Sequence, residues 1–339
     1  MNKAMFYKPI TGGNGSVRCY LCAHHCRIGP GKRGICAVRE NRGGVLYSLV
    51  YGKVVAEHAD PIEKKPLFHF MPGSRTYSIA TAGCNFRCEH CQNYEISQFP
   101  RERPDLPIPG REKSPQAIVD SARAGGCNSI SYTYTEPTIF LEFAADCAAL
   151  ARESGIKNVF VSNGFMSPES AAYIARLIDA NNIDLKGGEG FYRDICHARL
   201  APVLETIKIM KSAGVWVEIT TLVIPGWNDS PEALRRIADF IASVDTAIPW
   251  HVSRFHPDYK LLSAGETPAE TIRFAVKTGK EAGLKYVYSG NIAEPGGEDT
   301  VCPGCNNALV RRSGFTVLGM NISGRACPLC GLQIEGVWQ

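Results

Sequence analysis

The alternation of short apolar runs with helix-like stretches constrains the fold of this chain more than any other feature. Runs that suit β-strands occur at 77–80, 129–132, 158–162, 183–185, 215–223, 251–255 and 286–288. The stretches between them open on cap or proline signals such as Ser114-Pro115 and Ser230-Pro231, and several close at glycine. This order predicts a parallel sheet with helical crossovers, in which six or seven units close part of the way into a barrel.

Composition agrees with one barrel that carries appendages. The chain has 339 residues, of which 45% are hydrophobic and 21% are charged, as in ordinary soluble proteins. The net charge of +4 does not suggest a polyanionic partner, so we expect no nucleic-acid binding. The N-terminus lacks the apolar core of a signal peptide, and no apolar run reaches about 18 residues. We therefore expect a cytoplasmic protein that does not engage a membrane.

Three cysteines stand shortly after the first predicted barrel strand. Cys84, Cys88 and Cys91 are spaced C-x3-C-x2-C, and three thiolates on a short loop can hold three corners of a cubane iron–sulfur cluster. A structural zinc site closes its coordination sphere with four protein ligands, whereas an open corner admits a reactive molecule. The carboxyl end of a barrel strand is also where reactive groups collect. The alternative is a zinc knuckle closed by His90 or by a distant residue.

Two further cysteine groups lie outside the predicted barrel. The first group has ligand spacing for zinc or for a complete cluster, and consists of Cys19, Cys22, Cys26 and Cys36. We expect zinc there, because a closed site would staple a segment too short to have its own core; an auxiliary iron–sulfur cluster and a disulfide are the alternatives. The second group has the two-knuckle spacing of a zinc ribbon or a rubredoxin-like clip, and consists of Cys302, Cys305, Cys327 and Cys330. We expect structural zinc there as well, with mononuclear iron as the alternative.

Such grouping of cysteines predicts a reduced, metal-bearing protein rather than a disulfide framework. The three cysteines outside the groups are expected to be buried hydrophobes, and they are Cys127, Cys147 and Cys196. For Cys196, which follows the fourth predicted strand, the alternative is a thiol on the substrate side of the site.

The cysteine loop and its flanks resemble a known family. The run 82–93, Ala-Gly-Cys-Asn-Phe-Arg-Cys-Glu-His-Cys-Gln-Asn, is similar to the cluster motif of radical SAM enzymes, where SAM is S-adenosylmethionine. Together with the run 60–73, it resembles the radical SAM component of the AmmeMemoRadiSam system, a branch related to the pyruvate formate-lyase activating enzymes. The likeness extends from about Cys19 to the C-terminus. It implies an α/β fold with a partial (β/α)6 TIM-like barrel at 74–292, an N-terminal metal-binding segment at 1–73 and a C-terminal one at 293–339.

The resemblance also implies which residues contact SAM. At the strand ends, it implies that Thr135 and Glu136 contact the amino group of SAM and that Asp184 contacts the ribose. It places Lys186 and His256 at the carboxylate and Val223 near the adenine. Asn163 is implied as a further contact to the cofactor. His90 stands where the family usually has an aromatic residue that touches the adenine. Simpler structural roles stay open: a helix-initiating Glu136-Pro137 pair, a salt bridge between Asp184 and Lys186, and a strand-capping His256.

As activity, the resemblance implies that a 4Fe–4S cluster cleaves SAM reductively to a 5′-deoxyadenosyl radical, which takes hydrogen from a substrate. A flavodoxin or ferredoxin would then supply electrons, and the substrate is an unidentified small molecule or protein. Installation of a glycyl radical on a partner protein is an alternative within the family. A non-catalytic zinc-binding interaction module is the alternative outside it, but it leaves the open cysteine triad unexplained.

Overall fold

The structure, a computed structural model, describes residues 2–338 and is built around one eight-stranded sheet in the order β16-β15-β14-β13-β12-β11-β9-β8. β9 and β11 to β16 are parallel, and β8 joins the edge antiparallel to β9. The strands are β8 (Ala56–Pro61), β9 (Arg75–Ala80), β11 (Ser129–Tyr132), β12 (Lys157–Ser162), β13 (Ala180–Asp184), β14 (Trp216–Val223), β15 (Trp250–Arg254) and β16 (Val287–Gly290). Each predicted barrel strand overlaps one of these.

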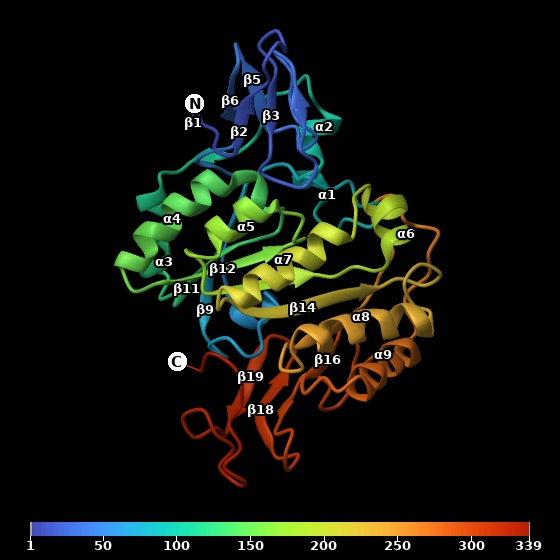
Figure 1. The fold of residues 1–339 in the computed structure, drawn as a ribbon. Coiled ribbons are helices and arrows are strands. Elements are labelled where there is room, and N and C mark those ends of the chain that lie inside the picture. Colours follow the sequence, from blue (N-terminus) through green and yellow to red (C-terminus); the bar gives the residue numbers. More distant parts are fainter. Residues whose placement is uncertain (1, 339) are drawn as a thin grey trace.

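Helices cover one face of this sheet (Figure 1). Parallel strands that follow each other in the sequence are neighbours in the sheet, and their crossover connections all have the same handedness. The crossover helices therefore lie on one face of the sheet, and the sheet curls around its opposite face. The helices are α3 (Pro115–Ala124), α4 (Leu141–Glu153), α5 (Pro168–Ile174), α6 (Glu189–Phe191), α7 (Ala201–Ser212), α8 (Pro231–Val244) and α9 (Ala269–Glu281). The predicted partial barrel is confirmed, with β8 as an addition to it.

Local sequence explains where these helices begin. The hydroxyl oxygens of Ser114, Ser167 and Ser230 each accept a hydrogen bond from a backbone N–H three residues on, at 3.1, 3.1 and 3.2 Å. Each serine is followed by a proline, whose missing N–H costs nothing in the first turn. The strand-to-helix junctions are therefore determined locally, which places the strand ends reliably.

The N-terminal segment forms small antiparallel sheets at one end of the molecule, the upper end in Figure 1. Its strands are β1 (Asn2–Lys3), β2 (Tyr7–Pro9), β3 (Val17–Cys19), β4 (Arg27–Ile28), β5 (Arg39–Arg42), β6 (Val45–Ser48) and β7 (Lys53–Val54), the last paired with β10 (Arg111–Glu112). The segment is tied to the barrel where Ala23 N donates to Phe165 O and Ser167 N donates to Leu21 O. It therefore sits against the loop that follows β12.

The C-terminal segment packs against the barrel at the opposite end (Figure 1). Its sheet contains β17 (Thr300–Val301), β18 (Ala308–Ser313) and β19 (Thr316–Met320). A shared apolar cluster joins Phe68 and Tyr288 of the barrel side to Leu309, Ile334 and Trp338 of the segment. The C-terminal segment therefore packs against the barrel through an apolar cluster separate from the barrel core.

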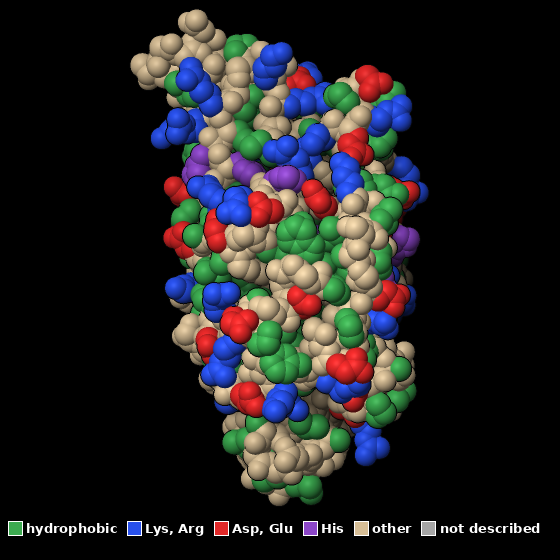
Figure 2. Space-filling model, turned by 90° about the vertical axis from the view of Figure 1, so that its right-hand side faces the viewer, with side chains coloured by type: hydrophobic (Ala, Val, Ile, Leu, Met, Phe, Trp, Pro, Cys, Tyr) green, Lys and Arg blue, Asp and Glu red, His purple; other side chains and the backbone are tan. Residues whose placement is uncertain are grey.

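Acidic and basic side chains intermingle on the face shown in Figure 2. Within residues 2–338, no helix combines the length and the hydrophobicity that crossing a membrane requires. The exposed large hydrophobic residues include several of the C-terminal segment: Phe315, Leu318, Met320, Leu329 and Leu332.

Candidate functional site

A cavity of about 570 Å³ lies at the carboxyl ends of the parallel strands. Side chains from the loop after β9 and from the ends of β11 to β15 line it. This is the end of a barrel at which reactive groups are normally found. Of the predicted site residues, it brings together Cys84, Cys88, His90, Cys91, Thr135, Glu136, Asn163, Asp184 and Lys186.

The cysteine loop begins three residues after β9 with Gly83 in a left-handed conformation, φ +105°. A side chain at Gly83 would lie 2.7 Å from Val38 of the N-terminal segment, so only glycine fits. Phe86 N donates to the Cys84 sulfur at 3.3 Å, and the Cys91 sulfur lies 3.2 Å from the Ser97 hydroxyl. All three thiols therefore face one cavity from a loop whose course is fixed by its neighbours.

Cys196 lies behind Cys88 rather than in the cavity. It ends the π-helical turn Tyr192–Cys196 after α6, is fully buried, and its carbonyl accepts from Arg87 N at 3.2 Å. Contact with Cys196 and burial together raise the pKa of the Cys88 thiol. Since Cys196 does not line the cavity, the expectation of a buried cysteine describes it better than that of a substrate-side thiol.

Glu136 connects the ends of β11 and β12. One carboxylate oxygen accepts from Thr138 N at 3.0 Å and from the Ser162 hydroxyl at 2.8 Å, and the other accepts from Asn163 N at 2.7 Å. Burial raises the pKa of Glu136, although these bonds oppose the rise. Both oxygens are used within the protein, so Glu136 positions its neighbours and starts the 3-10 turn Pro137–Phe140.

Asn163 is the residue that Glu136 holds. Its side-chain amide donates to the Asn85 side chain at 2.7 Å and lies 3.9 Å from the Cys84 sulfur. Thr135 is fixed differently, because its hydroxyl donates to Thr81 O at 2.8 Å. The ends of β11 and β12 are thus linked directly to the cysteine loop.

Tyr134 adopts a left-handed backbone conformation that glycine favours, φ +61°. A non-glycine residue there costs roughly 1–2 kcal/mol. Its hydroxyl donates to Asp60 at 2.5 Å, and the Lys65 ammonium lies 4.5 Å from the ring centre. Tyr134 therefore adds an aromatic wall to the cavity.

Asp184 and Lys186 face the cavity together, as strand alternation predicts for residues two apart. The Lys186 ammonium pairs with the Asp184 carboxylate at 2.7 Å. Burial alone would lower the pKa of Lys186, but Asp184 and the nearby thiols outweigh it and raise that pKa. The pair is both a salt bridge and part of the cavity wall.

His90 is buried at the cavity wall, with Nδ1 unpaired in the described part of the chain. Burial, with a smaller effect of Lys186, lowers its pKa to about 3. The ring is therefore neutral near pH 7 and can offer one nitrogen to a bound molecule.

Two predicted contacts do not reach this cavity. Val223 is fully buried in the core, because alternation along β14 turns Thr220 and Leu222 toward the cavity and Val223 away from it. His256 lies beyond the end of β15, is exposed, and pairs through Nδ1 with Glu266 at 2.7 Å. Ser253 of β15 lines the cavity instead.

Lys64 and Lys65 line the cavity and were not predicted. Their ammonium groups pair with the two oxygens of Asp60 at 3.0 and 2.7 Å. Burial lowers the pKa of Lys65 to about 8. Both lysines lie in the run 60–73, which already carried part of the family resemblance. That resemblance could therefore have pointed to them as site residues.

The C-terminal cysteines converge tightly. The Cys302 and Cys330 sulfurs are 3.6 Å apart, as are those of Cys305 and Cys327, and all four lie within 4.8 Å of one another. Tetrahedral zinc bonded to sulfur at about 2.3 Å places sulfur pairs about 3.8 Å apart, so this group fits a single metal ion.

Elsewhere in residues 2–338, no three potential ligands of this kind converge as closely. The four N-terminal cysteines instead surround a small buried void. All 14 cysteines are free thiols, so the disulfide alternative is wrong for this structure.

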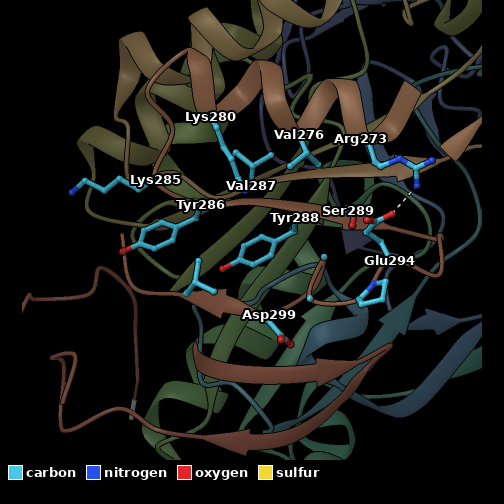
Figure 3. Close-up of a pocket in the computed structure, with 14 residues that line it drawn as sticks. Arg273, Val276, Lys280, Lys285, Tyr286, Val287, Tyr288, Ser289, Glu294 and Asp299 are labelled. Carbon is cyan, nitrogen blue, oxygen red and sulfur yellow. Dashed lines mark hydrogen bonds and ion pairs between the residues drawn. The ribbon is translucent and has the colours of Figure 1, made fainter. Parts of the chain in front are cut away.

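A second cavity of about 290 Å³ lies between α9, β16 and the segment that follows β16 (Figure 3). Arg273 of α9 pairs there with Glu294 at 2.8 Å, and Tyr288 of β16 faces the same space. None of the predicted site residues lines it. The chemistry indicated by the sequence therefore belongs to the cavity at the strand ends.

Comparison with known proteins agrees with this geometry. The sequence pattern of the radical SAM superfamily matches residues 78–241, which include the cysteine loop and the strand ends through β14. These residues form a radical SAM domain. An uncharacterized protein of Methanocaldococcus jannaschii is 46% identical over 338 residues, covering 99% of both chains.

More distant radical SAM relatives carry functional names. The pyruvate formate-lyase-activating enzyme of Clostridium pasteurianum is 22% identical over 213 residues, which cover 56% of this chain and 83% of that enzyme. The crystal structure of a radical SAM methyltransferase from Sphaerobacter thermophilus superposes with a TM-score of 0.51 and 13% identity, over 65% of this chain and 67% of that one. At that identity the methyltransferase shows a shared fold alone. The chain is an enzyme that carries a radical SAM domain.

The cavity fits the groups that a radical SAM enzyme binds. Three thiols without a fourth facing cysteine can anchor a cluster and leave one iron for a ligand. The orphaned Nδ1 of His90 and the paired charges of Asp184 and Lys186 offer polar contacts to a zwitterion such as SAM. A volume of about 570 Å³ lies within the usual range for small-molecule sites.

Proposed function

We propose that this protein cleaves SAM reductively at the cavity of Cys84, Cys88 and Cys91 and uses the product to take a hydrogen atom from a substrate. The observation that carries the proposal is a triad of cysteines that lines a cavity at the strand carboxyl ends, where no fourth cysteine of residues 2–338 lines it. When bound, the cluster supplies the electron that splits SAM into methionine and a 5′-deoxyadenosyl radical. We further propose that the chain belongs to the AmmeMemoRadiSam branch, on the motifs quoted above.

The chain's own residues would orient the bound molecules. Lys186 can pair with the SAM carboxylate, Asp184 can accept from the ribose hydroxyls, and the neutral ring of His90 can pack on the adenine. Glu136 acts indirectly, because it holds the backbone of Asn163.

For the substrate, we propose a small molecule or a segment of a partner protein that enters beside Tyr134 and the Lys64/Lys65 pair. A low-potential flavodoxin or ferredoxin would supply the electrons. Glycyl-radical activation of a partner protein is a second candidate, supported by the activating-enzyme name of one relative. Transfer of deuterium from labelled candidates into 5′-deoxyadenosine identifies the hydrogen donor.

The test uses full-length protein reconstituted anaerobically with iron and sulfide. With SAM and dithionite, we expect 5′-deoxyadenosine and methionine in equal amounts, measured by mass spectrometry. Cys88→Ala should abolish both products, whereas Cys127→Ala, the same change at a buried cysteine outside the cavity, should leave them unchanged. A colourless wild-type protein that forms neither product would falsify the proposal.

We also propose structural zinc at the C-terminal cysteines. The support is the 3.6 Å spacing of the sulfur pairs. About one zinc per chain should remain when the triad cysteines are replaced.

A further inference from the structure

The four N-terminal cysteines surround one buried void. Cys19 ends β3, Cys26 immediately precedes β4, and Cys22 pairs with Met166 of the barrel as an isolated bridge. With Cys36 they line a small buried void. Four thiolates can close on one ion or bind the four irons of a cubane, and the separation of the sulfurs decides between the two.

Sulfur spacing separates this group from the C-terminal one. Zinc needs sulfur pairs about 3.8 Å apart, and the C-terminal sulfurs meet this requirement within 4.8 Å. In residues 2–338 no three sulfurs of the N-terminal group come that close, and neither do those of Cys84, Cys88 and Cys91. A cubane binds each cysteine through a different iron, so its ligands stand farther apart than those of one ion. Within residues 2–338, the N-terminal group and the triad therefore both lack the tight convergence of the C-terminal cysteines.

A buried cation faces the same void. Arg39 is 1% exposed and lines the void, and its guanidinium pairs with Glu142 at 2.9 Å and donates to Met5 O at 2.5 Å. Its Nε has no hydrogen-bond partner in the described residues. An unpaired buried donor is costly, and the sulfurs of an anionic cluster would satisfy it.

The void also adjoins the cysteine triad. A ring nitrogen of His24, which lines the void, donates to Asn85 O at 2.8 Å. Arg101 donates both to Ile35 O, next to Cys36, and to Cys84 O, at 2.6 and 3.2 Å. Single side chains thus bridge the two cysteine groups, which gives a short path between them.

We propose that Cys19, Cys22, Cys26 and Cys36 hold a complete 4Fe–4S cluster, rather than zinc, that passes single electrons to the site of Cys84, Cys88 and Cys91. In each transfer the N-terminal cluster gains one electron from a reduced flavodoxin or ferredoxin and loses it to the second cluster, and no bond is made or broken at the first. With four protein ligands, it has no open iron for SAM. The cluster assignment stands alone, while the transfer step rests on the proposed function.

The first test is metal analysis of full-length protein in which Cys84, Cys88 and Cys91 are all replaced by alanine. This variant should keep about four irons and four sulfides per chain, plus about one zinc, against about eight irons in the wild type. Reduced with dithionite, it should show the paramagnetic resonance of a 4Fe–4S cluster. Cys127→Ala should match the wild type. A triple variant with about two zincs and no iron, or with one iron and no sulfide, would overturn the assignment.

The second test separates transfer from catalysis. Cys22→Ser/Cys36→Ser should lower 5′-deoxyadenosine formation about tenfold or more with reduced flavodoxin, but less than about threefold with dithionite, which can reduce the triad cluster directly. Equal loss with both reductants contradicts the transfer step. Absence of product in the wild type contradicts the proposed function instead, and leaves the metal analysis of the N-terminal site valid.

Discussion

Among individual residues, Cys196 decides whether the triad is open. It touches Cys88 from behind, and as a fourth ligand it would close the coordination sphere that the proposed function needs open. Its complete burial and its absence from the cavity wall argue for a packing role.

We therefore predict that Cys196→Ala leaves iron content and 5′-deoxyadenosine formation at wild-type values. The removed thiol contributes packing and no iron bond, so the loss is one of stability alone. Iron analysis and product quantification after anaerobic reconstitution check this, with Cys88→Ala as the matched variant that loses both. Loss of iron in Cys196→Ala equal to that in Cys88→Ala would make Cys196 a ligand and remove the open corner.

At the scale of elements, the ends of β11 and β12 depend on one carboxylate. Glu136 accepts from the backbone and side chain of Thr138, from the Ser162 hydroxyl and from Asn163 N. An amide at this position would point an N–H group at one of these donors.

Glu136→Gln should therefore destabilise the protein by about 1–3 kcal/mol and misplace Asn163 beside Cys84. The melting temperature, measured anaerobically, should fall by a few degrees, and SAM affinity should fall with iron content unchanged. Glu153→Gln, at an exposed glutamate that ends α4, is the control and should alter neither. A Glu136→Gln protein with wild-type melting and SAM affinity would show that the carboxylate has no positioning role.

At the scale of the whole molecule, His69 joins the C-terminal segment to the barrel. Its Nδ1–H donates to Glu335 O at 2.7 Å, and Nε2 accepts from the Tyr288 hydroxyl at 2.6 Å. Both nitrogens are satisfied in the neutral ring, and burial lowers the pKa from 6.5 to about 4.

The unfolded chain protonates this histidine at higher pH than the folded protein does. The contribution of neutral His69 to the free energy of unfolding is therefore complete above about pH 6.5 and is lost as the pH falls toward 4. The loss amounts to about 3 kcal/mol. Urea unfolding between pH 7 and pH 4 should show His69→Gln losing less stability than the wild type by about this amount. His58→Gln, at an exposed histidine, should follow the wild-type curve. Parallel curves for His69→Gln and wild type would refute the assignment.

The sequence by itself determined the order of strands and helices, the caps at Ser114, Ser167 and Ser230, and the three cysteine groups. These features depend on residues close together in the chain, where periodicity, capping and ligand spacing act directly. The likeness to a known family added the residues at the strand ends, and most of them do meet at one cavity.

Only the tertiary structure decided which side chains face that cavity. Val223 turns into the core and His256 pairs with Glu266, because the direction of a side chain at a strand end depends on the exit of the strand and on its neighbours. Cys196 reaches Cys88 from another loop. The separation of sulfurs within each cysteine group is likewise decided by packing around it, since equal numbers of cysteines can close on one ion or surround a larger cluster.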